Sequence, residues 1–338
     1  MPHDAKRGTV VVTGATGYLA GWVIVELLQR GYRVRATVRD LERAEPARAA
    51  IVARSATGTL ELVRADLLAD AGWDDAVAGA DAVLHTASPM PFDTRTDLIT
   101  SAREGTRRVL TAAARNGVQR VVFTSSGATA RPDDPAGVAI ETMWSEPVGT
   151  AAHMYPDSKI YAERLAWELA GELGLRLTTV LPSFMQGPPV GAPERAGTID
   201  VIRRLLDRAL PALPHLGWNI VDVRDVARLH VLALENPASI GERYHGSGTF
   251  HWYRDVARVL RAGLPEQTRK VPTRELPDVV VRLMALRNRQ LAMIVGELGI
   301  TRTVDNSKAR TQLAWTPRDA ETTILDTARA LIADGAGR

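Results

Sequence analysis

The chain of 338 residues contains no cysteine, and this absence removes several chemistries at once. The protein can have no disulfide, no thiolate nucleophile and no zinc or iron–sulfur centre held by thiolates. Long apolar runs are also absent: none approaches the roughly 18 residues of a membrane span, and residues 1–7 lack the apolar stretch of a secretory signal. We therefore expect a cytoplasmic protein without a membrane partner.

The charge pattern argues against a nucleic-acid partner. The 42 basic and 39 acidic residues leave a net charge of +3, and the arginines are interspersed with acids instead of clustering. No metal is expected, because the seven histidines are scattered and His245 and His251 lack acidic neighbours at ligand spacing. A hydrolase is not expected either, because no Gly-x-Ser-x-Gly elbow occurs in the chain.

A glycine turn near the start of the chain is the first positive signal. A β-branched run at 9–13 leads directly into Gly14 and Gly17, an apolar-periodic helix continues to residue 30, and a second strand is predicted at 33–38. In such a βαβ unit the first glycine permits the tight turn and the second lets backbone amides approach a pyrophosphate, whose charge the helix N-terminus stabilises. The turn therefore predicts a dinucleotide cofactor.

Strand and helix patterns alternate through the first half of the chain. Strands are predicted at 9–13, 33–38, 59–64, 82–86, 119–125 and 175–181, and helices between them at 17–30, 40–54, 70–78, 94–116 and 156–173. Alternation of this kind predicts an α/β fold, a Rossmann-type doubly wound parallel sheet covered by helices on both faces. Cofactor and substrate should then meet at the carboxyl ends of the strands.

The regular alternation stops after residue 181, where a Pro/Gly-rich stretch begins. Helices with short extended pieces between them are predicted beyond it, at 195–209, 222–235, 251–263, 275–297 and 319–335. We expect residues 1–181 to form the dinucleotide-binding domain and residues 182–338 to form mostly a smaller, mostly helical substrate-binding lobe. Parts of 215–250 are expected to return to the first domain.

A tyrosine and a lysine four residues apart form the candidate catalytic pair. Tyr155 and Lys159 lie on one face if they share a helix, and Pro156 is tolerated only in that helix's first turn. With only six tyrosines and four lysines in the chain, about 0.07 such pairs are expected by chance. A phenol titrates near 10, and an ammonium about 4 Å away at an effective dielectric near 20 stabilises its anion by on the order of 4 kcal/mol. The pair therefore predicts acid–base chemistry, whereas the alternative is a core aromatic beside a solvated lysine.

Small hydroxyl residues end the fifth predicted strand. Thr124, Ser125 and Ser126 come just before Gly127, at a carboxyl end where the oxygen of a substrate carbonyl could lie. Ser and Gly also close ordinary strands, which is the alternative reading. Together with Tyr155, Ser126 is the predicted donor of a hydrogen bond to that oxygen.

These motifs resemble those of the extended short-chain dehydrogenase/reductases. Within them, the chain is most similar to the branch of dihydroflavonol reductases, cinnamoyl-CoA reductases and microbial aldehyde/ketone reductases. The resemblance runs through residues 13–20 (TGATGYLA), 66–67 (DL), 85–90 (HTASPM), 124–126 (TSS), 155–159 (YPDSK), 181–182 (LP), 187–188 (GP), 221–227 (VDVRDVA) and 305–309 (DNSKA). It thus spans nearly the whole chain.

Matched residue by residue, the resemblance implies a carbonyl reductase. Tyr155 would donate the proton, Lys159 would hold the nicotinamide ribose and lower the pKa of the tyrosine, and Ser126 would polarise the carbonyl while hydride passes from the nicotinamide to the carbonyl carbon. The implied cofactor-binding residues are Thr13, Gly14, Thr16, Gly17, Tyr18, Leu19, Arg39, Arg43, Asp66, Leu67, Thr86, Ala87, Ser88, Thr124, Lys159 and Pro182. Ala20 stands at the third glycine position, where alanine is allowed.

The residue after the second strand predicts which nicotinamide is used. An acid there accepts the ribose 2′-hydroxyl of NAD, whereas arginine accommodates the 2′-phosphate of NADP. This chain has Arg39, with Arg43 one turn further on, so NADP(H) is the predicted cofactor. The alternative is a surface arginine that pairs with Asp40 or Glu42.

The substrate is less determined than the cofactor. The residues expected to line its site are mostly apolar, which predicts a small hydrophobic or aromatic carbonyl compound: Met90, Phe92, Ser126, Gly127, Trp144, Tyr155 and Phe184. For Phe92 and Trp144, packing is an equal alternative. Arg131, where the resembling flavonoid enzymes have asparagine, argues against a dihydroflavonol, and Asp222 replaces a frequent histidine without an evident reason.

Two other functions remain open. A nucleotide-sugar epimerase or dehydratase of the same fold would keep its NAD bound, although Arg39 argues against it, and a non-catalytic NADP sensor would not need Ser126, Tyr155 and Lys159. The protein is expected to be a monomer or a homodimer.

Overall fold

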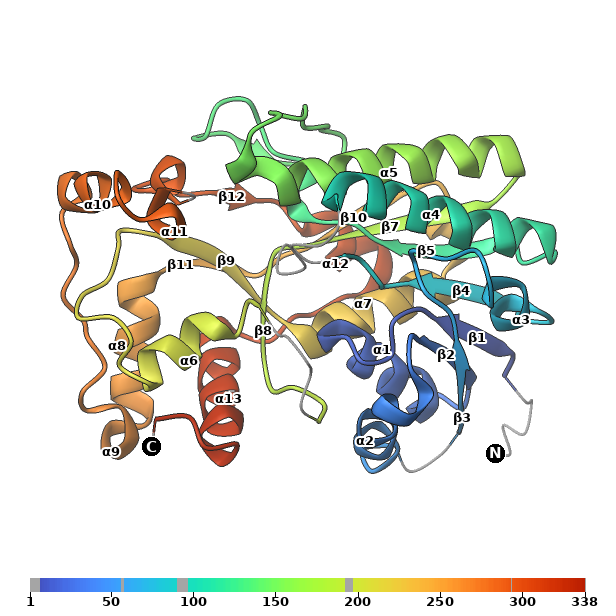
Figure 1. The fold of residues 1–338 in the computed structure, drawn as a ribbon, viewed down its shortest axis with the longest axis horizontal. Helices are drawn as coiled ribbons and strands as arrows, with labels where there is room; N and C mark the ends of the chain where they lie inside the picture. Colours follow the sequence, from blue (N-terminus) through green and yellow to red (C-terminus); the bar gives the residue numbers. More distant parts are fainter. Residues whose placement is uncertain (1–6, 56–57, 90–96, 192–196, 293, 338) are drawn as a thin grey trace.

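The computed structural model describes residues 7–55, 58–89, 97–191, 197–292 and 294–337. Its centre is a seven-stranded sheet in which every neighbouring pair is parallel, in the order β3-β2-β1-β4-β5-β7-β10 (Figure 1). The strands are β1 (Thr9–Val12), β2 (Arg33–Val38), β3 (Thr59–Arg64), β4 (Ala82–His85), β5 (Arg120–Thr124), β7 (Arg176–Pro182) and β10 (Arg243–Gly246). The predicted doubly wound parallel sheet is confirmed.

Helices cover both faces of this sheet because its strands are apolar on both sides. Val10 and Val12 of β1 point into one buried cluster, and Val11 between them points into the other, as the two-residue period of a strand requires. On the first face lie α1 (Tyr18–Gln29), α2 (Leu41–Val52), α7 (Val223–Glu235) and α12 (Ser307–Leu313). On the second face lie α3 (Trp73–Val77), α4 (Leu98–Arg115) and α5 (Met154–Leu173).

The strand order reverses between β1 and β4. From β1 the chain continues outward to β2 and β3, whereas β4, β5, β7 and β10 extend the sheet in the other direction. In doubly wound sheets the ligand crevice lies at the carboxyl ends of the two strands between which the order reverses, which are β1 and β4 in this sheet. All the predicted cofactor residues on loops follow strands at this edge of the sheet.

The second half of the chain contributes a smaller lobe beside the carboxyl edge of the sheet (Figure 1, left). A three-stranded sheet in the order β11-β9-β8 connects it to the main body. Its strands are β8 (Phe184–Gln186), β9 (Gly217–Asp222) and β11 (Thr249–Trp252), and its helices are α6 (Asp200–Leu206), α8 (Tyr253–Gly263), α9 (Pro265–Thr268), α10 (Asp278–Ala285), α11 (Arg289–Ala292) and α13 (Ala320–Ala333). A two-residue ladder pairs β6 (Val138–Ala139) with β12 (Thr303–Val304).

Four short 3-10 helices also occur in the described part of the chain: η1 (Gly127–Thr129), η2 (Ala151–His153), η3 (Pro237–Ser239) and η4 (Val295–Glu297).

One hydrophobic cluster joins the lobe to the main sheet. It runs from Val10 of β1 and Ile24 of α1, through Val226 of α7, to the lobe residues Tyr253 of α8 and Ile324 of α13. The division of the chain at residues 181 and 182 stays a prediction. Strand β10, within the range 215–250, pairs with β7 in the main sheet. Among the described residues, no helix has the length and apolarity needed to cross a membrane.

Several helices differ from their predicted bounds, and for three of them the structure shows the reason. The spacing predicts one helix over 275–297, but the structure has α10, α11 and η4 there, because the Asn288 side chain accepts the Leu291 amide and starts a new turn. The helix predicted at 70–78 is only α3, since Gly72 precedes it with φ +87°. The helix predicted at 195–209 is the shorter α6, and Arg208 beyond it has φ +57°.

Candidate active site

The glycine turn after β1 has the geometry that dinucleotide binding requires. Gly14 adopts φ +78°, and a Cβ atom there would lie 3.0 Å from the Cβ of Ala87. The amide of Gly17 donates to the carbonyl of Gly14 at 2.8 Å, and a Cβ at Gly17 would lie 3.0 Å from that same oxygen. The turn is therefore too tight for a side chain at either glycine without movement of its neighbours.

The N-terminus of α1 is open for an anion. Gly17 is its exposed N-cap, no side chain caps the helix, and its first turn carries no acid. Thr16 is partly exposed, whereas the side chains of Tyr18 and Leu19 are buried, which leaves their main chain to meet a phosphate. These residues fit the pyrophosphate of a dinucleotide.

Thr13 connects the ends of β1 and β4. Its Oγ1 accepts hydrogen bonds from the amides of Thr86 (3.0 Å) and Ala87 (2.9 Å), so its own proton is donated to Nδ1 of His85 at 2.8 Å. Burial lowers the pKa of His85 to about 3, which keeps the ring neutral and able to accept. The buried Thr13 hydroxyl thus holds together the carboxyl ends of β1 and β4. Ser88 continues this edge and is partly exposed.

The end of β2 meets the glycine turn and carries the predicted phosphate-binding arginine. Thr37 accepts the Gly14 amide through its hydroxyl (3.1 Å) and the Ala15 amide through its carbonyl (2.9 Å). Arg39 and Arg43 have exposed side chains just beyond, and the Asp40 carboxylate caps α2 by accepting the Arg43 amide at 3.1 Å.

Asp66 and Leu67 follow β3, as predicted for residues beside an adenine. Both are partly exposed. The Asp66 carboxylate accepts the Leu68 amide at 3.0 Å, and Arg108 donates to the Leu67 carbonyl at 2.8 Å. Two elements, β3 and α4, therefore hold this loop near the crevice.

Lys159 reaches the carboxyl end of β5 from α5. Its Nζ atom donates to the carbonyl of Thr124 at 3.3 Å, and its side chain is buried. Tyr155 lies one turn earlier on the same helix and is partly exposed, and Pro156 occupies the first turn, as predicted. Lys159 thus faces the strand end that precedes Ser126, and Tyr155 lies on the same helix one turn away.

Within the part of the chain that the structure describes, the Ser126 hydroxyl hydrogen has no acceptor. Its Oγ accepts the amide of Ala128 at 3.2 Å and so caps η1, which leaves the hydroxyl hydrogen for another acceptor. The side chain is partly exposed. Strand-end turn chemistry and a carbonyl-binding role are therefore compatible at this residue.

The pKa of Tyr155 is shifted in the direction opposite to the one that the resemblance implies. Burial raises it to about 12, because a phenolate loses hydration inside the protein. Burial lowers the pKa of Lys159 to about 8, and the Glu163 carboxylate one turn on opposes that shift. Lowering of the Tyr155 pKa by Lys159 stays a prediction for the protein with its cofactor and substrate.

The predicted substrate residues are only partly described. Met90 and Phe92 lie outside the described residues. Phe184 stacks on Trp218, with ring centroids 4.7 Å apart, and a Cβ at Gly127 would lie 3.4 Å from the carbonyl of Pro182, the buried last residue of β7. Trp144 is 39% exposed, but one ring face is covered by the guanidinium of Arg243, 3.8 Å from its centroid.

Two polar residues near β5, His230 and Glu163, carry contacts that were not predicted from the sequence. His230 on α7 accepts from the Thr124 hydroxyl at 2.8 Å, because its Nδ1 donates to the Val226 carbonyl. Glu163 accepts from Ser125, the neighbour of Ser126. Spacing on α5 could have indicated Glu163, which follows Lys159 by four residues.

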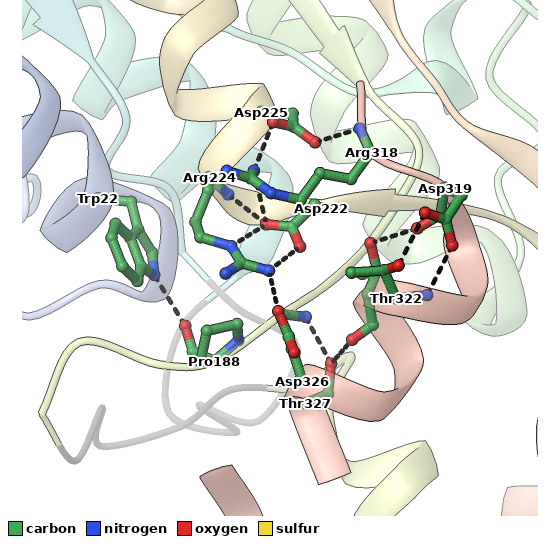
Figure 2. A network of polar contacts seen from close by, with 12 residues as sticks. Trp22, Pro188, Asp222, Arg224, Asp225, Arg318, Asp319, Thr322, Asp326 and Thr327 are labelled. Atoms are coloured by element: carbon green, nitrogen blue, oxygen red, sulfur yellow. Dashed lines mark hydrogen bonds and ion pairs between the residues drawn. The ribbon is translucent and has the colours of Figure 1, made fainter. Parts of the chain in front are cut away.

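Asp222, which the sequence leaves unexplained, is part of a buried network between the main sheet and the lobe (Figure 2). It caps α7 through the Arg224 amide (2.8 Å) and pairs with the Arg224 guanidinium, which also reaches Asp326 on α13 at 2.8 Å. A carboxylate therefore suits this position because a cation faces it.

The same network holds the loop after β8. The amide of Gly187 donates to Thr327 on α13 at 2.7 Å, and its carbonyl accepts from the Tyr18 hydroxyl at 2.7 Å. Trp22 donates to the Pro188 carbonyl at 2.8 Å (Figure 2). The helix that begins at the glycine turn is thus tied to the loop beside Phe184.

Comparison with known proteins agrees with this architecture. Residues 10–245 match the family described as the NAD dependent epimerase/dehydratase family. The chain is 39% identical over 268 residues to cinnamoyl-CoA reductase 1 of Oryza sativa subsp. japonica, with 78% of each chain covered. It is 34% identical over 285 residues to a dihydroflavonol 4-reductase of Dianthus caryophyllus, covering 80% of this chain and 78% of that one.

Solved structures show the same relationship. The yeast methylglyoxal/isovaleraldehyde reductase Gre2, complexed with NADPH, has a TM-score of 0.81 and 26% identity to this chain, and the match covers 98% of this chain and 100% of that one. A sheet of this order with a lobe at its carboxyl edge defines a Rossmann-type dinucleotide-binding fold. The chain belongs to the NAD dependent epimerase/dehydratase family, and the resemblance to its extended reductases is confirmed.

Proposed function

We propose that the protein is an NADPH-dependent reductase that converts an aldehyde or ketone to an alcohol. The observation that carries the proposal is the contact of Lys159 with the Thr124 carbonyl, because it brings the Tyr155 helix to the strand end that carries Ser126. This strand end lies one strand away from the crevice between β1 and β4, where the open α1 N-terminus fits a pyrophosphate.

Each residue of the site has one task in the reaction. NADPH, when bound, supplies the hydride that is added to the carbonyl carbon. Ser126 donates a hydrogen bond to the carbonyl oxygen, Tyr155 gives that oxygen its proton, and Lys159 positions the ribose and offsets negative charge on the phenol. One hydride and one proton thus convert the C=O group to CH–OH.

Arg39 supports the choice of NADPH over NADH. Its exposed side chain follows β2, next to the glycine turn that Thr37 holds, where a ribose 2′-phosphate would lie. The yeast Gre2 reductase, whose structure is similar to this chain, was solved in complex with NADPH. The relatives described above are reductases, so they do not favour the epimerase alternative over a reductase.

The substrate is proposed to be a hydrophobic or aromatic carbonyl compound. The stacked pair of Phe184 and Trp218 supports this choice, since apolar rings near the carboxyl edge favour an apolar ligand. The related proteins are named as reductases of cinnamoyl-CoA, dihydroflavonols and methylglyoxal, and all three compounds carry a carbonyl group.

Oxidation of NADPH followed at 340 nm tests the proposal directly. The purified protein is offered aldehydes, aryl ketones, diketones and keto esters, with NADPH and NADH compared for each. Consumption of NADPH with formation of the alcohol is expected for at least one class. Cofactor that copurifies as tightly held NAD, together with no consumption on any carbonyl, would instead indicate an epimerase or dehydratase.

A further inference from the structure

Arg243 on β10 uses its whole guanidinium group. Nε and Nη2 donate to the two oxygens of Glu163 at 2.9 and 3.1 Å, Nη2 also donates to the Thr129 hydroxyl at 3.0 Å, and Nη1 donates to the carbonyls of Glu141 (2.7 Å) and Met143. The side chain is only 7% exposed. All five of its N–H groups are therefore satisfied by protein.

Glu163 is matched to this arginine in the same way. The carboxylate is fully buried and accepts from Arg243, from Ser125 (2.6 Å) and from Thr179 (2.8 Å). The Arg243 cation holds the pKa of Glu163 below its usual range despite burial, so the carboxylate stays ionised. A carboxylate only accepts, whereas an amide in its place would direct a donor at other donors.

Apart from Glu163, the groups that Arg243 binds belong to one segment, residues 126–145, which begins at the carboxyl end of β5. Thr129 ends η1, three residues after Ser126, and its hydroxyl also donates to the Ser126 carbonyl at 2.8 Å. Met143 comes just before Trp144, whose ring covers the guanidinium. The segment folds on itself through a bond from the Ser145 amide to the Thr129 carbonyl at 2.9 Å.

Arg243 also contacts α5, the helix of Tyr155 and Lys159, through Glu163. Glu163 lies one turn after Lys159 on α5, so the ion pair connects the segment 126–145 to the helix that carries the proposed proton donor. Arg164 of α5 also donates to the Ser145 carbonyl at 3.0 Å, so the end of the segment has a second tie to the helix. Arg243 differs because it binds both sides at once from a third element, β10.

We propose that Arg243, through Glu163, is a positioning residue that holds the segment 126–145 against α5 and so places Ser126 opposite Tyr155. This inference rests on the proposed function. Lysine cannot replace this arginine, because a point ammonium with three donors cannot bind a carboxylate and two carbonyls in one plane. Neither Arg243 nor Glu163 reacts with the substrate; their ion pair sets the relative position of Ser126 and Tyr155.

The test compares Arg243→Lys with a matched control, Arg120→Lys. Arg120 is also a well-bonded arginine, with donors to Arg176 O (2.8 Å), Thr178 (2.9 Å) and Ser239 (2.8 Å), but it lies at the amino end of β5. Backbone hydrogen exchange of the full-length protein without cofactor or carbonyl reports on the segment. NADPH titration and steady-state kinetics report on binding and on turnover.

For Arg243→Lys we expect faster exchange at the amides of Thr129, Met143 and Ser145, by about 10- to 150-fold, the effect of losing hydrogen bonds to a charged group. We expect kcat to fall by about 10²-fold, as for a small displacement of reacting groups, while the Kd of NADPH is unchanged. Arg120→Lys should change neither the exchange of these three amides nor kcat.

A milder pair of variants applies if Arg243→Lys does not fold. Thr129→Val removes the hydroxyl that Arg243 binds, with similar volume, and Thr129→Ser keeps it. Faster exchange and lower kcat in the valine variant, with recovery in the serine variant, support the proposal. Unchanged exchange in the segment, whatever happens to kcat, overturns it. If the wild type reduces no carbonyl, the proposed function fails, and the exchange comparison still decides whether Arg243 holds the segment.

Discussion

The Thr13 hydroxyl donates a hydrogen bond to Nδ1 of His85 at 2.8 Å and joins the ends of the two strands between which the sheet order reverses. The same oxygen accepts the amides of Thr86 and Ala87. A single buried oxygen thus shapes the loop that is proposed to lie beside the nicotinamide.

Thr13→Val should destabilise the protein by about 1–3 kcal/mol, because it leaves two part-buried amides and the buried ring nitrogen of His85 without their partner. Thr13→Ser, which keeps the hydroxyl, should recover most of this loss. Urea unfolding gives the free energy, and NADPH titration should show weaker binding in the valine variant. Equal stability of the two variants would contradict the role of the hydroxyl.

Tyr155→Phe should lower kcat by about 10²–10⁴-fold, the usual effect of losing a general acid. The Kd of NADPH should stay near the wild-type value, because the phenol meets the carbonyl and not the phosphates. Tyr161→Phe, six residues further along α5 at an exposed position, is the matched control and should keep full activity. Full activity of Tyr155→Phe would show that another group supplies the proton.

Arg39→Ala should reduce the preference for NADPH over NADH by about 10- to 150-fold, since a charge-assisted hydrogen bond to the 2′-phosphate is lost. The measurement is the ratio of kcat/KM for the two cofactors. Arg48→Ala, on the exposed side of α2 and paired with Glu45 at 2.8 Å, should leave the ratio unchanged. An unaltered ratio in Arg39→Ala would place the 2′-phosphate elsewhere.

The activity should fall as the pH rises through about 8. Burial lowers the pKa of Lys159 to about 8, so its ammonium is present below that pH and lost above it. The pH profile of kcat/KM for NADPH, which reports groups of the free enzyme, is the measurement. Lys159→Arg should be slower but without this decline, because an arginine stays charged. A decline that is identical in both proteins would assign it to another group.

Acid should weaken the fold below pH about 6.5. Burial lowers the pKa of His230 to about 4, whereas an exposed histidine titrates near 6.5. Between these values the unfolded chain binds a proton that the folded chain does not, so the stability present above pH 6.5 is lost as the pH falls toward 4.

The expected loss from His230 alone is on the order of 3 kcal/mol. Urea unfolding at a series of pH values measures it. His230→Gln, which has a donor and an acceptor but does not titrate, should show a shallower dependence on pH. His85 and His245, whose pKa values burial also lowers, should still contribute in that variant.

The sequence predicts those parts of the fold whose signal is local. The β-branched run before Gly14, and Pro156 at the start of the Tyr155 helix, are features that a few neighbouring residues determine, and both are confirmed in form. Strand β8 has only three residues, which is too short for a two-residue period to indicate it. The three-stranded sheet of the lobe was therefore visible only as short extended pieces.

The parts that the sequence does not predict depend on contacts between distant residues. Glu163 and Arg243 are 80 residues apart, and no spacing rule relates them. The direction of the Tyr155 pKa follows from burial, which only the packed structure reveals. Asn288 interrupts the helix predicted over 275–297 because its side chain competes for a backbone amide, a choice that apolar periodicity does not record.

The bonds from Arg224 to Asp326 and from Gly187 to Thr327 also bear on engineering by recombination. A chimera that takes α13 from one parent and all residues up to the end of α7 from another would cut through both bonds. Such a hybrid would leave Asp222 and Arg224 facing a surface selected for different charges. Exchanges of specificity between relatives should therefore transplant α7 and α13 as a unit.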